Sequence, residues 1–149
     1  MRGKAAALAG VLVLLATACG GGGSDGDRLS KEEFQSRANA ICDKYQQQLQ
    51  ALGTPSSLDE IPDLVDQALA ILNKEIDEVA ALNPPEEMQG TFDQLIAASN
   101  KTKAAADDLS TAAKAGDQAA VEKALDAGNA ASDEADRLAG ELGLDSCKN

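Results

Sequence analysis

Only three aromatic residues, Phe34, Tyr45 and Phe92, occur in the 149 residues of this chain. A core with so few aromatic side chains has to be built from Leu, Ile, Val and the abundant Ala. Alanine is the best helix former and is depleted in strands. The composition therefore predicts an all-α fold.

Apolar residues recur at steps of three and four along four segments, which is the period of one helix face. The start and stop signals between these segments predict helices over about 31–52, 62–82, 85–115 and 117–142. These signals are a capping box at Ser30 and Glu33, then Gly53, Pro62, Pro84, Pro85, Gly116, Asp117 and Gly143. Short connections favour antiparallel neighbours. The sequence thus predicts an up-down-up-down four-helix bundle over residues 29–149.

The third predicted helix has a polar interruption in its apolar face. That face carries Met88, Phe92, Leu95, Ser99, Thr102, Ala106, Leu109 and Ala113, and the face of the fourth helix includes Val121, Ala124, Leu125 and Gly128. At about 1.5 Å per residue, Ser99 and Thr102 lie level with Tyr45 of the first helix. Either the Tyr45 hydroxyl bonds one of these hydroxyls, or the three residues line a small ligand pocket.

The first 18 residues have the form of an export signal. Arg2 and Lys4 precede an uncharged, largely apolar run over residues 5–18. As a helix, about 14 residues rise only about 21 Å, which is short of a bilayer core of roughly 30 Å. We therefore expect residues 1–18 to be a removable signal peptide.

Small residues over 16–18 stand directly before Cys19, and the arrangement resembles the lipobox of bacterial lipoproteins. In a lipobox the cysteine thiol receives a diacylglycerol. The usual Leu three positions before the cysteine is replaced here by Ala16, with Leu15 one step earlier. The same residues fit the small-x-small site of an ordinary signal peptidase, which would release a secreted protein beginning at Cys19.

The number of cysteines favours lipidation. Three unmodified cysteines would leave one odd thiol in an oxidising compartment, whereas acylation of Cys19 leaves Cys42 and Cys147 as a pair. We therefore expect a Cys42–Cys147 disulfide and acyl chains on Cys19 that hold the protein to the outer face of the cell membrane.

The residues after Cys19 predict a flexible spacer and a strongly acidic domain. Residues 19–28 are rich in glycine and carry no large apolar side chain, as in flexible linkers. The leader contains two of the 13 basic residues and none of the 25 acidic ones, so its removal changes the net charge from −12 to −14. Nucleic acid would repel such a chain, so none is expected as a partner.

Two segments carry a family resemblance, Ala-Asn-Ala-Ile-Cys over residues 38–42 and Leu-Gly-Leu-Asp-Ser-Cys over residues 142–147. Together with the lipobox and the glycine-rich linker, they make the chain similar to a group of small actinobacterial lipoproteins. The resemblance implies an extracytoplasmic helical domain with a Cys42–Cys147 bridge. It implies no activity.

The residue types needed for common catalytic chemistry are scarce. Histidine is absent, which removes the usual general base and the commonest metal ligand. Acidic clusters at residues 59–63, 107–108 and 133–136 lack the spacing of a calcium-binding loop and are better explained as solvated helix faces. We expect no catalytic residues, no metal and no cofactor.

Two functions remain open from the sequence. The favoured one is a non-catalytic, membrane-anchored helical module that contacts a protein or cell-wall partner. The alternative is a lipoprotein that holds a small ligand between helices, near Tyr45, Ser99 and Thr102.

Overall fold

The computed structural model describes residues 28–54, 56 and 60–148. Within them the chain forms α1 (Lys31–Ala51), α2 (Ile61–Ala80), α3 (Glu86–Ala115), α4 (Gln118–Leu142) and the short 3-10 helix η2 (Asp145–Cys147). The described residues contain no strand. The fold is all-helical, as predicted, and each predicted helix lies within two residues of the observed one.

The predicted capping signals act at the helix ends. At the start of α1, the Ser30 side chain accepts from the Glu33 amide while the Glu33 carboxylate accepts from the Ser30 amide. The Asp117 side chain accepts from the amide of Ala120 and caps α4. Gly116 and Gly143 end α3 and α4 in the left-handed conformation that glycine adopts without strain.

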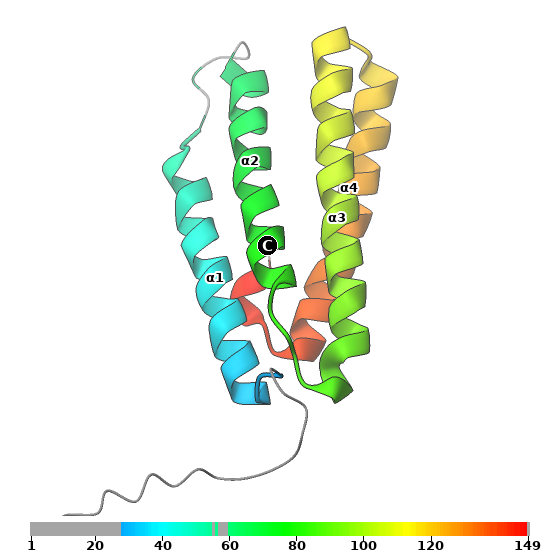
Figure 1. The fold of residues 1–149 in the computed structure, drawn as a ribbon. Coiled ribbons are helices and arrows are strands. Elements are labelled where there is room, and N and C mark those ends of the chain that lie inside the picture. The colour runs from blue at the N-terminus through cyan, green and yellow to red at the C-terminus, as the bar shows by residue number, and fades with distance from the viewer. Residues whose placement is uncertain (1–27, 55, 57–59, 149) are drawn as a thin grey trace, which may run out of the picture.

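The four helices run up, down, up and down, and they form two antiparallel pairs (Figure 1). Helices α3 and α4 are in the most extensive contact, while α2 touches both α1 and α3. Gln35 of α1 donates to the carbonyl oxygen of Leu142 of α4 at 2.8 Å, and η2 packs against both helices. The C-terminal tail is therefore a structural part of the bundle.

Alanine explains the close packing of α3 and α4. Ala98, Ala105 and Ala112 are buried at intervals of seven along α3, and α4 buries Ala124, Ala131 and Leu138 at the same interval. A Cβ atom added at Gly128 would lie 3.6 Å from the Cβ of Ala105. Small side chains allow two helix axes to come close together.

The large core side chains gather at one end of the bundle, which we call the disulfide end (residues 29–45, 76–98 and 135–148). There the rings of Phe34 and Phe92 meet edge to face at 5.3 Å between centroids. Leu138, Leu142 and Leu144 complete this core and are almost fully buried. All buried residues of the contiguous hydrophobic cluster belong to this end.

At the other end, which we call the alanine end (residues 46–54, 62–72 and 99–134), the predicted buried faces are partly wrong. Ala113 is exposed while its neighbour Ala112 is buried, and Leu125 is 46% exposed while Ala124 is buried. On this stretch α3 turns its buried alanines toward α4, where Gly128 lies beside Ala105, while Ser110 on another face of α3 bonds Asp66 of α2. A pattern that assumes the same neighbours along the whole helix misses this turn.

Candidate functional site

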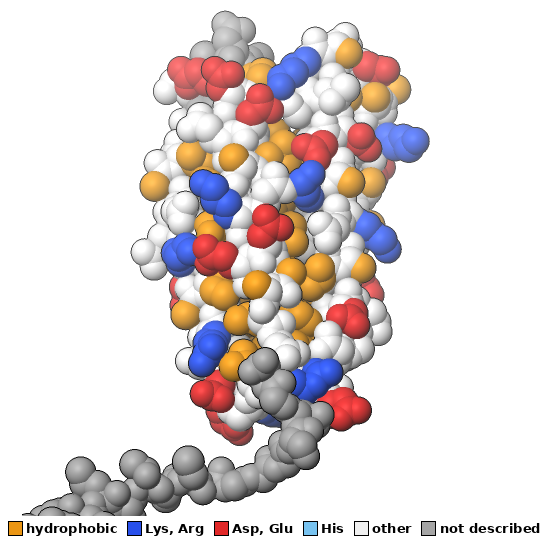
Figure 2. Space-filling model, in the orientation of Figure 1, with side chains coloured by type: hydrophobic (Ala, Val, Ile, Leu, Met, Phe, Trp, Pro, Cys, Tyr) orange, Lys and Arg blue, Asp and Glu red, His pale blue; other side chains and the backbone are white. Residues whose placement is uncertain are grey.

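A cavity of about 80 Å³ lies between α2 and α3, where the disulfide end meets the alanine end. Leu72, Ile76 and Val79 of α2 face Leu95 and Ile96 of α3 across it. Ala135 and the two disulfide cysteines also line it, and one side is open to solvent. Figure 2 shows hydrophobic side chains gathered along the junction of these two helices.

Ser99 and Thr102 both line this cavity. The Ser99 hydroxyl donates to the carbonyl oxygen of Leu95 at 3.0 Å, and the Thr102 hydroxyl donates to that of Ala98 at 3.3 Å. Such bonds to the preceding turn satisfy a hydroxyl inside a helix. The polar interruption seen in the sequence is therefore one wall of a cavity.

Tyr45 does not belong to this group, which corrects the predicted set of pocket residues. Its ring is buried, but its hydroxyl donates to Oε1 of Glu78 at 2.7 Å, and the Lys44 ammonium lies 4.3 Å from the ring centroid. The expected bond to Ser99 or Thr102 is also absent. Height along the bundle placed Tyr45 level with them, but height does not determine toward which neighbour a helix turns a side chain.

Glu75 is the charged residue of the cavity, and the sequence pattern did not single it out. It is half-buried, and its side chain takes part in none of the side-chain hydrogen bonds or ion pairs of the described residues. Burial raises the pKa of its carboxyl group to about 7. A helical projection would have found it, because at 3.6 residues per turn Glu75 lies about 40° from Val79 on the apolar face.

The disulfide joins Cys42 of α1 to Cys147 of η2, with the two Cα atoms 5.1 Å apart, and this confirms the predicted pair. Because both cysteines line the cavity, the bridge fixes its wall. The bridge closes a loop of about 105 residues, which is worth about 4 to 5 kcal/mol in the chain-entropy model.

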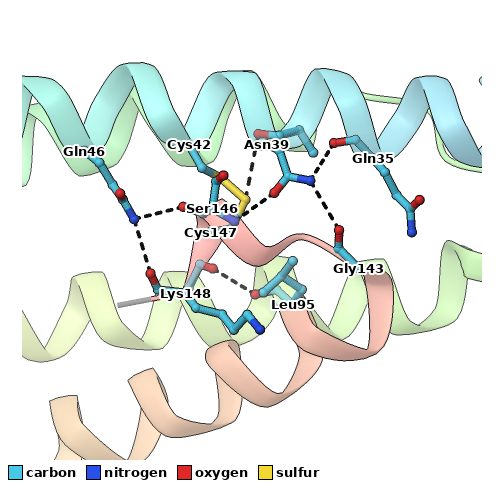
Figure 3. Close-up of a disulfide and its surroundings, with 11 residues drawn as sticks. Gln35, Asn39, Cys42, Gln46, Leu95, Gly143, Ser146, Cys147 and Lys148 are labelled. Carbon is cyan, nitrogen blue, oxygen red and sulfur yellow. Dashed lines mark hydrogen bonds between the residues drawn. A yellow bond between two sulfur atoms is a disulfide. The ribbon is translucent and has the colours of Figure 1, made fainter.

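Polar side chains on α1 hold the tail on both sides of the bridge (Figure 3). Asn39 accepts from the amide of Ser146 at 2.8 Å and donates to the carbonyl oxygen of Gly143 at 3.2 Å. Gln46 donates to the carbonyl oxygens of Ser146 and Lys148. These side chains were missed by sequence reasoning, although their spacing around Cys42, at residues 39, 42 and 46, is that of one helix face.

The described acidic residues form no evident cation site. Among the residues that the structure describes, no group of three or more Asp, Glu, His or Cys side chains is arranged to hold a metal ion. Several of these carboxylates pair with cations instead, as Asp107 does with Lys103 and Glu134 with Arg137. Asp59 of the first cluster lies outside the described residues.

The predicted signal peptide over residues 1–18 and the predicted lipidation site Cys19 also lie outside the described residues, as does the linker except for Arg28. In the described part of the chain, no helix combines the length and apolar character needed to span a bilayer.

Comparison of the chain with protein-family models, with curated proteins and with solved structures found no significant match to any of them.

Proposed function

We propose that this protein is an extracytoplasmic, lipid-anchored helical module that acts by binding a protein or cell-wall partner and not by catalysis. The observation that carries the proposal is the Cys42–Cys147 disulfide. Structural disulfides belong to oxidising compartments, outside the cytoplasm. With two of the three cysteines bridged, Cys19 is the remaining one, and it stands where a lipobox cysteine would.

Three further features of the sequence support a binding role outside the cell. The chain lacks histidine, so that catalysis would have to rely on carboxylates, lysines and hydroxyls. Its strong negative charge disfavours nucleic acid and keeps the domain well solvated. The resemblance to small actinobacterial lipoproteins is consistent with this location and belongs to the same proposal.

The anchor is tested by replacing Cys19 with Ala and following the full chain in membrane and soluble fractions. We expect the wild-type protein in the membrane fraction with incorporated fatty acid, and Cys19→Ala without label and outside that fraction. Ser24→Ala, a change within the same linker, should behave as the wild type. A Cys19→Ala protein that remains membrane-bound would contradict the anchor.

The partner is tested on intact cells with a membrane-impermeant cross-linker. If the module meets its partner at the membrane surface, the wild-type chain gives a discrete adduct and Cys19→Ala loses it. If Cys19→Ala gives the same adduct as the wild type, contact with this partner does not require the anchor.

A second candidate function is the binding of a small ligand between helices. The observation that favours it is the cavity between α2 and α3, with aliphatic walls and three polar side chains, Glu75, Ser99 and Thr102. Ligand sites commonly combine apolar walls with a few polar groups. At about 80 Å³, the enclosed space suits only a small molecule or the end of a larger one.

A further inference from the structure

When Glu75 is ionised, the polar side chains around the cavity offer hydrogen-bond acceptors and no free donor. The hydroxyl protons of Ser99 and Thr102 are both used in bonds to carbonyl oxygens of α3, so their lone pairs remain to accept. An ionised Glu75 can only accept. A polar group that enters this cavity therefore has to be a donor.

Glu75 also makes the cavity a site for positive charge. Moving a carboxylate away from water is costly unless a cation accompanies it. The ion pairs of the described residues involve other carboxylates, so no described residue supplies such a cation for Glu75. The excess of acidic over basic residues in the whole chain adds a field that attracts cations.

The cavity walls favour a small ligand with an aliphatic chain. Leu72, Ile76, Val79, Leu95 and Ile96 are all aliphatic. The volume of about 80 Å³ is well below the ~150 Å³ of an engineered cavity that accepts benzene. A short alkyl chain suits this space better than an aromatic ring.

We propose that this cavity binds a small aliphatic primary amine. Its alkyl chain lies between Leu72, Ile76 and Leu95. Its ammonium group, which carries three donors, bonds the Glu75 carboxylate and the hydroxyl oxygens of Ser99 and Thr102. The inference rests on the second candidate function above and names its ligand class.

Other ligand classes fit less well. An acid would meet the Glu75 carboxylate with like charge, and an alcohol would leave that charge without a counterion. A hard metal ion needs about six oxygen ligands, whereas the cavity has one carboxylate and two hydroxyls.

The test is a titration of the full chain with n-butylammonium chloride at about pH 8, where a carboxyl group with a pKa of about 7 is mostly ionised. Methyl NMR signals of the cavity residues report binding. We expect a dissociation constant on the order of millimolar for a ligand of five non-hydrogen atoms. n-Butanol, the neutral analogue of similar shape, should bind about tenfold more weakly.

Two matched variants separate recognition of the amine from general charge effects. Glu75→Gln keeps the shape of the side chain and should weaken n-butylammonium binding at least tenfold. Asp77→Asn removes the same charge from an exposed site on α2 and should change binding less than twofold. Equal affinity of the wild type and Glu75→Gln would overturn the proposal.

The remaining outcomes distinguish this inference from the function on which it rests. If n-butanol shifts the signals of Leu72 and Ile76 and binds as tightly as n-butylammonium, the amine class is wrong while small-ligand binding stands. If neither compound shifts any cavity signal at tens of millimolar, both are overturned.

Discussion

The two ends of the bundle are built from the same helices but stabilised by different means. The disulfide end holds Phe34, Phe92 and the buried leucines, and the tail is joined to α1 by a covalent bond and by the side chains of Asn39 and Gln46. The buried residues of the alanine end are mostly alanines on α3 and α4.

Helix α2 shows the same difference along its length. Toward the alanine end it is joined to α3 through Asp66, which pairs with Lys114 at 3.0 Å and accepts a hydrogen bond from Ser110. Exposed ion pairs of this kind contribute little to stability. The large side chains Leu64, Val65 and Leu72 are only half-buried there. We therefore expect the disulfide end, with its large buried side chains and its covalent link, to be the more stable one. The cavity lies where the two ends meet.

The disulfide gives the largest expected effect. We expect Cys42→Ser with Cys147→Ser to lower the free energy of unfolding by about 4 to 5 kcal/mol, because the unfolded chain regains the entropy of a long open loop. Urea unfolding of the double variant measures this loss, and reduction of the wild type should reproduce it. A loss below about 1 kcal/mol would mean that the noncovalent contacts of the tail suffice.

Truncation of one large side chain at each end compares the two cores directly. Phe34→Ala should cost about 3 to 4 kcal/mol, because the ring is fully buried against Phe92. Leu125→Ala should cost no more than about 1 kcal/mol, because Leu125 is already 46% exposed and alanine favours the helix. Equal losses in urea unfolding would remove the distinction between the ends.

The turn into the tail gives a smaller effect. Gly143 has φ of 72°, and a Cβ atom there would overlap the side-chain amide of Gln35, which donates to the carbonyl oxygen of Leu142. Gly143→Ala should therefore cost about 2 kcal/mol. Gly90→Ala is the control, since no atom lies within 4 Å of its added Cβ and alanine favours the helix. Thermal unfolding that ranks Gly90→Ala below Gly143→Ala would contradict this account of the turn.

Glu75 gives the smallest effect, and its sign depends on pH. Its folded pKa of about 7 exceeds the ordinary value of 4.5, so the folded protein binds the extra proton between these values. Glu75 therefore makes its full contribution to the free energy of unfolding below pH 4.5, and this contribution is lost as pH rises through about 7. The loss is on the order of 1 to 2 kcal/mol after allowance for the partial exposure of the side chain.

Replacement of Glu75 by Gln should abolish this loss. Urea unfolding at about pH 5 and pH 8 measures it in the wild type, in Glu75→Gln and in the exposed control Asp77→Asn. If Glu75→Gln retains the full difference between the two pH values, another group is responsible.

The features that depend on local sequence were predictable. Caps, glycine stops and prolines gave the helix ends, and the number of cysteines gave the disulfide, because each acts through a few neighbouring residues or through simple pairing. The wall formed by Ser99 and Thr102 was also visible as a break in an apolar face.

The features that depend on how helices face each other were not predictable in the same way. The exposure of Leu125, the orientation of Tyr45 toward Glu78 and the burial of Glu75 all depend on which neighbouring helix each face meets. A single helix period cannot show which of two neighbours a residue contacts. A helical projection would have placed Glu75 beside the apolar face of α2. Only the structure shows that it lines a cavity together with Ser99 and Thr102 of α3.

Amide hydrogen exchange on the full chain tests most directly whether the two ends differ in stability. We expect the amides of residues 88–98 and 135–142 to exchange only through global unfolding. The amides of residues 105–115 and 118–131 should exchange at least about tenfold faster, through local opening of the alanine end. Uniform protection along α3 and α4, or slower exchange at the alanine end, would contradict the account.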